Sequence, residues 1–386
     1  MNFPRIAIIT PGTFPIPSGA SSSVERVVEY TAGLAAAYVN ATIYGKQWPD
    51  QQEHDCIKGV RYERVRAVNQ RQYLQRVLRR VVADAPDIVQ IENRPKSVLA
   101  IRKALPSAQV WLNLHSTSFV HPAHISARTL RQSIRLADRI FVNSRYLYEQ
   151  IVRVSPQAAP RIVINPLGVD VDRFISRWTV EGARISSENK LIRGWEKRRI
   201  ILFAGRLIPL KGVHHLLRAA PHVIKRHPDV LIVIVGSASY GRNRKTAYVR
   251  RLKRLGRLYP QHVRFVPYVP HEEMPVWYAM ADIAVVPSVK REAFGLVNVE
   301  AMAAGVPVVA ASVGGIREVI VDGVTGLLLP PRQLSSHLSK TLNELLADAV
   351  RLERMGRAGV QHVHTLFTWQ HTADRWGKEA AAALRL

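Results

Sequence analysis

The chain has 386 residues, of which 47% are hydrophobic and 22% are charged, a composition that excludes a disordered or fibrous protein. This length exceeds one typical compact domain, so we expect two domains, and the single cysteine, Cys56, excludes an intramolecular disulfide. The 55 Lys and Arg outnumber the 29 Asp and Glu, and the resulting net charge of +26 attracts anions without choosing among nucleotides, lipid head groups, glycans and nucleic acid.

The first half of the chain alternates short β-rich runs with helical stretches. The predicted strands are 5–10, 41–45, 87–92, 110–116, 139–144 and 161–168, and the predicted helices are 24–37, 72–84 and 127–136. Apolar strands separated by helices predict a parallel, doubly wound sheet. The first apolar run is too short for a signal sequence or a membrane span, and no later segment is long enough to cross a bilayer.

The same pattern starts again after a charged stretch. Further strands are predicted at 200–205, 230–236, 263–269, 283–288, 307–312 and 326–330. We therefore expect an N-terminal domain over 1–175, a linker over 176–198 and a C-terminal domain over 199–369. A last helix within 370–386 packs either on its own domain or back on the first. Parallel sheets bind ligands beyond the carboxyl ends of their strands, so two such domains facing one another would form a binding cleft.

The stretch "FAGRLIPLKG", 203–212, contains two cations near a predicted helix start. Arg206 follows the tip of a strand, and Lys211 with Gly212 opens the next helix. The free N–H groups and positive dipole of a helix start favour an anion, so this stretch predicts a phosphate site. The alternative is that Arg206 and Lys211 are solvated loop charges.

The stretch "REAFGLVNVEAMAAG", 291–305, carries two glutamates on either side of an apolar turn. A helix is predicted over 296–304 with its end at Gly305; Glu292 lies in the loop before it and Glu300 about one turn inside it. The two carboxylates can reach sites roughly a sugar diphosphate apart, and each can accept hydroxyl hydrogen bonds. A nucleotide sugar fits this arrangement; a solvated loop charge and a helix-face carboxylate are the alternative.

The chain resembles a known family in these motifs. "GRLIPLKG", "FGLVNVEAMAAGVPVVA" and "GGIREVIVDGVTGLLLPP" in the second half are similar to the retaining glycosyltransferases of family 4. "PIPSGASSSVE" and "NPLGVDVDRF" extend the resemblance, more weakly, through the first half. It implies an α/β protein with the GT-B fold, in which two Rossmann-like, doubly wound parallel-sheet domains face one another across a cleft.

The resemblance also implies a set of site residues. The catalytic set is Arg206, Lys211, Glu292 and His115, and the donor-binding set is Gly19, Gly205, Phe294, Gly295, Leu296 and Glu300. Arg206 and Lys211 would hold the donor diphosphate, Glu292 the transferred sugar and Glu300 the ribose. Backbone N–H groups at 294–296 would contact sugar and phosphate. His115 matches a histidine beside the donor sugar, although a lone histidine at a strand end is also common as a structural residue.

The sequence departs from the family pattern in two places. Relatives commonly have paired glycines where this chain has Gly19 and Ala20, and Ser21–Ser23 can instead cap the following helix, which puts acceptor specificity in doubt. Leu167 precedes Gly168 where relatives often have other residues. Asp170 and Asp172 match the spacing of a metal-binding aspartate pair in another glycosyltransferase fold, but here they precede the predicted linker. Arg206 and Lys211 can also neutralise a leaving diphosphate without a metal ion. We therefore expect no metal and no cofactor.

The expected activity is transfer of a sugar from a UDP- or GDP-linked donor to a glycan, lipid-linked or other hydroxyl acceptor, in cell-envelope or polysaccharide biosynthesis. The resemblance favours a front-face retaining reaction over a covalent glycosyl-enzyme intermediate. A sugar-nucleotide epimerase of the same fold is one alternative. A non-catalytic basic structural, coat or polyanion-binding protein is another.

Two basic clusters predict a further partner. Residues 242–257 form a basic amphipathic helix in which Val249, Leu252, Leu255 and Leu258 share a buried face, and Arg71, Arg76, Arg79 and Arg80 lie together on a first-domain helix. These clusters would attract an anionic membrane or a polyanionic glycan, or they are solvated helix faces. No nucleic-acid motif is present, so we expect no specific nucleic-acid binding. The expected location is the cytoplasm, with a peripheral position at the inner membrane surface or in a cell-envelope or coat structure as the alternative.

Overall fold

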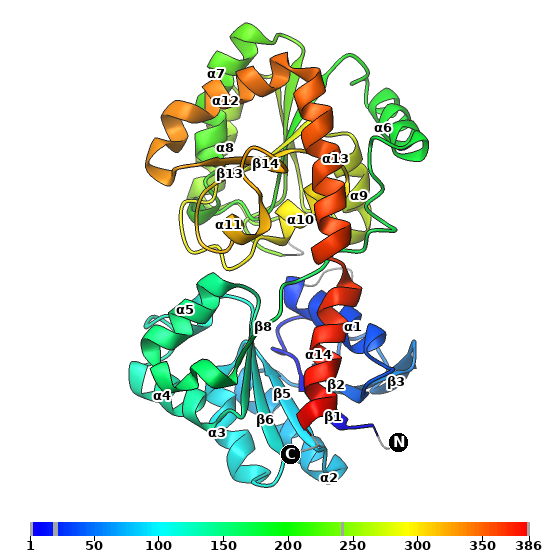
Figure 1. Cartoon of the computed structure of the whole chain (residues 1–386), viewed down its shortest axis with the longest axis vertical. Coiled ribbons are helices and arrows are strands. Elements are labelled where there is room, and N and C mark those ends of the chain that lie inside the picture. Colours follow the sequence, from blue (N-terminus) through cyan, green and yellow to red (C-terminus); the bar gives the residue numbers. More distant parts are fainter. Residues whose placement is uncertain (1–2, 18–21, 241–242, 384–386) are drawn as a thin grey trace. The chain divides into compact units, whose positions relative to one another are not determined.

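The chain divides into two α/β units in a computed structural model that describes residues 3–17, 22–240 and 243–383 (Figure 1). Unit 1 consists of Met1–Leu167 and Trp369–Leu386, and unit 2 consists of Gly168–Thr368. Each unit contains one sheet of buried strands with helices packed on it.

The sheet of unit 1 has eight strands in the order β3-β4-β2-β1-β5-β6-β7-β8. They are β1 (Arg5–Ile9), β2 (Asn40–Lys46), β3 (His54–Ile57), β4 (Val60–Val65), β5 (Ile88–Glu92), β6 (Gln109–Leu114), β7 (Arg139–Val142) and β8 (Ile162–Ile164). All neighbouring pairs are parallel except β3 with β4, the hairpin that the sequence pattern did not predict. Strand order reverses between β1 and β5, and such a switch point is where open parallel sheets bind ligands.

The helices of unit 1 mostly begin at polar caps, although no side chain caps the helix that begins at Pro95. They are α1 (Ser23–Leu34), α2 (Gln70–Asp84), α3 (Pro95–Ala104), α4 (Ala127–Leu136), α5 (Arg145–Val154) and α14 (Trp369–Ala383), with short 3-10 turns η1 (Thr117–Val120) and η2 (Pro156–Arg161). The side chains of Asn69, Ser126 and Ser144 accept backbone N–H hydrogen bonds at the starts of α2, α4 and α5. The last helix, α14, lies beside α1 (Figure 1) and adds Ala373, Trp376 and Ala380 to the core of unit 1.

The sheet of unit 2 has six parallel strands in the order β11-β10-β9-β12-β13-β14. They are β9 (Arg199–Ala204), β10 (Val230–Val235), β11 (Val263–Val266), β12 (Ile283–Val286), β13 (Val308–Ala311) and β14 (Gly326–Leu329). The switch point lies between β9 and β12. The strand β11 is shorter than the predicted 263–269 because Pro267, which follows it, has no N–H to donate to the sheet.

The helices of unit 2 are α6 (Val180–Ile192), α7 (Val213–Arg226), α8 (Ala247–Gly256), α9 (Met274–Ala279), α10 (Leu296–Ala303), α11 (Ile316–Val319), α12 (Leu334–Ala347) and α13 (Ala349–Leu366), with 3-10 turns η3 (Pro209–Lys211), η4 (His271–Glu273) and η5 (Pro331–Gln333). Within the basic helix, Val249 and Leu252 are buried as predicted, but Leu258 is 67% exposed. The helix ends at Gly256, so its periodicity does not reach Leu258.

The structure confirms the fold class of two doubly wound parallel-sheet units. The division in sequence falls at Leu167 and Gly168 rather than at residue 175, and residues 176–198, expected to be a linker, lie in unit 2, where they contain α6. The predicted cleft between the units stays a prediction. In residues 3–17, 22–240 and 243–383, no helix is both long and apolar enough to span a membrane.

Candidate active site

Two loops of unit 2 meet at the switch point of its sheet. The loop after β9 carries Arg206 and Lys211 and reaches Gly212, which caps α7 in a left-handed conformation (φ +68°). A Cβ atom on Gly212 would lie 1.8 Å from the carbonyl oxygen of Pro287, which follows β12. Only a glycine permits this approach of the two backbones, so the loops after β9 and β12 are held against each other.

Lys211 and Glu292 form an ion pair across these two loops. The Nζ atom of Lys211 lies 2.5 Å from Oε2 of Glu292, and the Ser288 hydroxyl donates to the same oxygen at 3.2 Å. The side chains of Lys211 and Glu292 are 23% and 17% exposed, so both can reach a ligand. Two residues that are 81 positions apart in sequence are thus neighbours, although the sequence-based roles placed them on different parts of the donor.

Arg206 lies against an aromatic ring that the sequence analysis did not single out. Its guanidinium carbon lies 5.2 Å from the ring centroid of Tyr240, which follows β10, the strand next to β9. The Nε atom of Arg206 is buried and has no hydrogen-bond partner among the described residues. The cation–π contact therefore holds the guanidinium in place while leaving a donor without a partner.

The turn before α10 is shaped by Gly295. This glycine has φ +88°, and the Asn298 side chain donates to its carbonyl oxygen at 2.9 Å. Phe294 is buried, and Leu296 is the first helical residue, as predicted. Backbone N–H groups at a helix start have no partner within the helix, so the turn offers donors to a ligand.

Glu300 is held from both sides of its carboxylate. It is 5% exposed; Oε1 lies 2.8 Å from Nε2 of His271, and the Tyr278 hydroxyl donates to Oε2 at 3.1 Å. The ring of Phe174 lies 5.7 Å from both the His271 and the Tyr278 ring. These contacts fix the orientation of the Glu300 carboxylate, a group that can accept several hydrogen bonds. His271 and Tyr278 were not found from sequence, because nothing in "VPHEEMPVWY" points toward residue 300.

The predicted loop of unit 1 is described at residues 15–17 and again from Ser22 onward, and Gly19 lies outside the described residues. Ser22 caps α1: its hydroxyl accepts from Val24 N–H at 3.3 Å, and its own N–H donates to Glu25 Oε2 at 3.2 Å. This reciprocal capping box supports the capping role suggested for the serine run. Glu25 is fully buried, and burial raises its pKa above the ordinary range.

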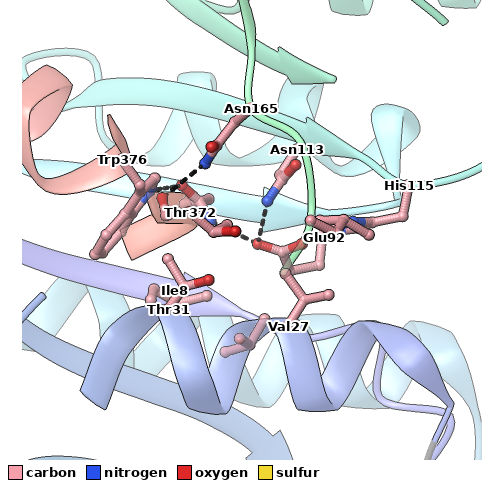
Figure 2. Close-up of a pocket in the computed structure, with 12 residues that line it drawn as sticks. Ile8, Val27, Thr31, Glu92, Asn113, His115, Asn165, Thr372 and Trp376 are labelled. Atoms are coloured by element: carbon pink, nitrogen blue, oxygen red, sulfur yellow. Dashed lines mark hydrogen bonds and ion pairs between the residues drawn. The ribbon is translucent and has the colours of Figure 1, made fainter. Parts of the chain in front are cut away.

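His115 follows β6 at the carboxyl edge of the unit 1 sheet. Its side chain is 5% exposed, and its Nε2 atom lies 2.6 Å from Oε2 of Glu92, the last residue of β5 (Figure 2). His115 was predicted from the sequence as a site residue, but Glu92 was not. The signal was present, since Gln90 and Glu92 put two polar side chains on one face of an otherwise apolar strand.

Among residues 3–17, 22–240 and 243–383, no group of three or more His, Cys, Asp and Glu side chains is arranged to hold a metal ion.

Family models match both units. The model described as glycosyl transferases group 1 matches residues 187–362, and the model of a glycosyl transferase 4-like domain matches residues 23–168. Spore coat protein SA of Bacillus subtilis is 30% identical over 370 residues, which cover 96% of this chain and 97% of that protein. The chain belongs to the group 1, family 4-like glycosyltransferases.

Other relatives of this glycosyltransferase carry related names. The putative glycosyltransferase YtcC of B. subtilis is 27% identical over 96% of this chain and 90% of its own length. The D-inositol 3-phosphate glycosyltransferase of Nocardia farcinica is 36% identical, over 66% of this chain and 54% of its own length.

Solved structures agree on the fold. Sucrose-phosphate synthase from Thermosynechococcus elongatus has a TM-score of 0.79 at 23% identity and covers 99% of both chains. HepE from Anabaena, solved in complex with UDP and glucose, has a TM-score of 0.76 at 21% identity and covers 98% of this chain and 100% of its own.

Proposed function

We propose that this glycosyltransferase is a retaining, metal-independent hexosyltransferase that moves a sugar from a UDP- or GDP-linked donor to a glycan, lipid-linked or other hydroxyl acceptor. The observation that carries the proposal is the Lys211–Glu292 pair at the carboxyl ends of β9 and β12, with Arg206 in the same loop as Lys211. A cation pair suits a diphosphate, and the adjacent carboxylate suits sugar hydroxyls. The HepE structure with UDP-glucose supports the choice of donor class.

In the proposed mechanism, the bond between the anomeric carbon and the donor phosphate breaks while the acceptor oxygen bonds to the same face of that carbon. The acceptor proton passes to the departing phosphate. Arg206 and Lys211 stabilise the negative charge that grows on the diphosphate, an interaction stronger in the transition state than in the ground state. Glu292 accepts a hydroxyl of the transferred sugar.

The remaining predicted residues bind the donor in this proposal. Glu300, oriented by His271 and Tyr278, accepts the ribose hydroxyls. Gly205, Gly19 and the backbone of 294–296 lie close to the phosphates and sugar, and His115 hydrogen-bonds the sugar.

The experiment compares nucleotide binding by the wild type, Lys211→Ala and the matched control Lys340→Ala. Lys340 also pairs with a carboxylate of unit 2, Glu344, but it is exposed on α12. A ligand at 100 times its Kd stabilises by about 2.7 kcal/mol, so UDP or GDP should raise the Tm of the wild type and of the control by about 5 °C. Lys211→Ala should show little shift, and its turnover should fall by about 100- to 1000-fold.

A panel of UDP, GDP and their glucose and mannose conjugates that leaves the wild-type Tm unchanged would overturn the donor class. Retention is checked by ¹H NMR of the product, because an α-linked donor should yield an α-linked product. A β-linked product would refute a retaining mechanism. A covalent adduct trapped with a 2-fluoro donor and seen by mass spectrometry would refute the front-face step.

A basic groove in unit 1 supports the proposed contact with an anionic membrane or polyanionic glycan. The groove, of about 380 Å³, is lined by Arg66, Arg76, Arg79, Arg80, Glu53 and Val65. Arg71, the other member of the predicted cluster, is not in its lining. Vesicles of anionic phospholipid should bind the wild type more strongly than the Arg76→Gln/Arg79→Gln variant, and zwitterionic vesicles should bind neither. Equal binding to both kinds of vesicle would refute the membrane contact.

The proposed location is the cytoplasm, with peripheral contact at the inner membrane surface, and the proposed pathway is cell-envelope or polysaccharide biosynthesis. The name of the spore coat relative supports a role in a coat structure as well. An epimerase or a non-catalytic protein is less well supported, because glycosyltransferase family models match both units.

A further inference from the structure

Three buried polar side chains hold His115 at three separate points. Its Nε2 atom lies 2.6 Å from Glu92 Oε2, its backbone N–H donates to Asn93 Oδ1 at 2.9 Å, and its carbonyl oxygen accepts from Asn143 Nδ2 at 3.2 Å. Glu92 is fully buried, and Asn93 and Asn143 are nearly so. Asn93 has a left-handed backbone (φ +53°), a conformation that asparagine tolerates better than most residues. The position and the ring orientation of His115 are therefore both fixed.

Burying the Glu92 carboxylate at this position costs free energy. Among the described residues, the His115 ring is the hydrogen-bond partner of the Oε2 atom of this carboxylate. Removing a carboxylate from water costs several kcal/mol unless it is well paired. Its other oxygen, Oε1, accepts from Gln90 Nε2 at 2.6 Å and from Asn113 Nδ2 at 3.4 Å. Trp376 of α14 donates in turn to Gln90 Oε1 at 2.7 Å, so the chain of hydrogen bonds runs from the last helix to His115.

Figure 2 shows this group around a small cavity between α1, the sheet and α14. Thr31 Oγ1 and Asn165 Oδ1 belong to residues that line the cavity, and neither atom has a hydrogen-bond partner among the described residues. The Nδ1 atom of His115 is likewise buried and without a partner there. A buried polar atom without a partner is costly, so such an atom is expected to find one in water or a ligand.

The contacts determine which ring nitrogen of His115 carries the proton. A carboxylate can only accept hydrogen bonds, so Nε2 carries the proton that Glu92 receives. When the ring is neutral, its lone pair is therefore on Nδ1, the atom that has no partner among the described residues.

We propose that Glu92 is a positioning residue, which fixes the Nε2–H tautomer of His115 so that Nδ1 accepts a hydrogen bond from a sugar hydroxyl. This inference rests on the proposed function, since it assigns His115 a sugar ligand. Nothing in the motifs shared with the family required a carboxylate at the end of β5. The contact of Glu92 with Nε2 and the buried Nδ1 atom of His115 support this role.

The structure provides a sharp variant, Glu92→Gln. Gln90 and Asn113 both donate toward Oε1, so the amide oxygen of the new side chain would face them and its NH₂ group would face His115. The amide would then donate to Nε2, and the ring proton would have to move to Nδ1. Volume and packing barely change, but the hydrogen-bonding sense of Nδ1 reverses. Glu379→Gln is the matched control, because Glu379 of α14 lies 3.7 Å from Arg139 at the surface of unit 1.

The test combines ¹⁵N NMR of histidine-labelled protein with kinetics on a nucleotide-sugar donor that the wild type turns over. His115→Gln assigns the ring signals. In the wild type and in Glu379→Gln, Nε2 should show a protonated-type shift and Nδ1 an unprotonated-type shift, and Glu92→Gln should exchange the two. Its kcat should fall about 100-fold while the KM for the donor changes less than threefold. The wild-type spectrum decides the tautomer even if Glu92→Gln fails to fold.

Two results would overturn the inference: an unprotonated Nε2 in the wild type, or exchanged ring shifts in Glu92→Gln with wild-type kcat. The first excludes the tautomer and the second excludes its role in catalysis. Failure of the proposed function is distinct, because the wild type itself would then neither bind nor turn over any donor, whereas the ¹⁵N spectrum needs no substrate.

Discussion

Gly212 is the position where the smallest change should disturb the candidate active site most. Gly212→Ala places a methyl group 1.8 Å from the Pro287 carbonyl oxygen, far inside van der Waals contact. The obstructing atom is backbone, so no side-chain rotation relieves the overlap. The loops after β9 and β12 must separate, and the Lys211–Glu292 pair joins those same loops.

The magnitude follows from a comparison with Gly323, another glycine of unit 2. Gly323 has φ +76°, close to the +68° of Gly212, but a Cβ atom there would meet nothing within 4 Å. Gly323→Ala therefore measures the left-handed backbone cost alone, about 1 kcal/mol. Gly212→Ala adds an overlap worth about 2–3 kcal/mol. We expect it to lower the free energy of unfolding of unit 2 by about 3–4 kcal/mol.

Hydrogen exchange followed by mass spectrometry on β9 and β12 reads the opening of unit 2 separately from unit 1. Gly212→Ala should lose protection on both strands and should bind UDP or GDP at least tenfold more weakly than Gly323→Ala. Equal loss of protection in the two variants would refute the steric reasoning. Unchanged nucleotide affinity in Gly212→Ala would refute the coupling between this backbone contact and the site.

Three further predictions concern charge and pH. Burial and the neighbouring His215 lower the pKa of His214 to about 4, so the unfolded chain binds a proton at a higher pH than the folded chain does, and stability falls as the pH drops from about 6.5 to about 4. The His214→Gln variant should lose about 1 kcal/mol less stability between pH 7 and pH 4.5, as measured by urea titration at the two pH values. Burial raises the pKa of Glu25, so the folded state disfavours the ionised carboxylate. In thermal unfolding, Glu25→Gln should therefore be about 1 kcal/mol more stable than the wild type at pH 7, and this difference should shrink toward pH 4. Tyr240→Ala should weaken UDP or GDP binding about two- to fivefold in calorimetry by releasing Arg206, whereas Tyr240→Phe should bind as the wild type does.

The type of fold and the local parts of the candidate site are predictable from the amino-acid sequence. Alternating apolar runs and helices predicted two parallel sheets, since hydrophobic periodicity is a local property of the chain. The helix from Leu296 with its end before Gly305, and the glycine that opens α7, were equally local. Even the gathering of these residues was partly predictable, because the carboxyl ends of all parallel strands meet at one edge.

Which side chains become partners depends on how the strands and helices are arranged in space. The neighbour of Lys211 is Glu292 because β9 lies next to β12, and Arg206 lies on Tyr240 because β10 lies on the other side of β9. Glu92 reaches His115 because β5 and β6 pair in register, and α14 returns to unit 1 because its apolar face fits that core. Strand order, and the unit on which a helix packs, depend on contacts between residues far apart in sequence. Local hydrophobic periodicity does not predict those contacts.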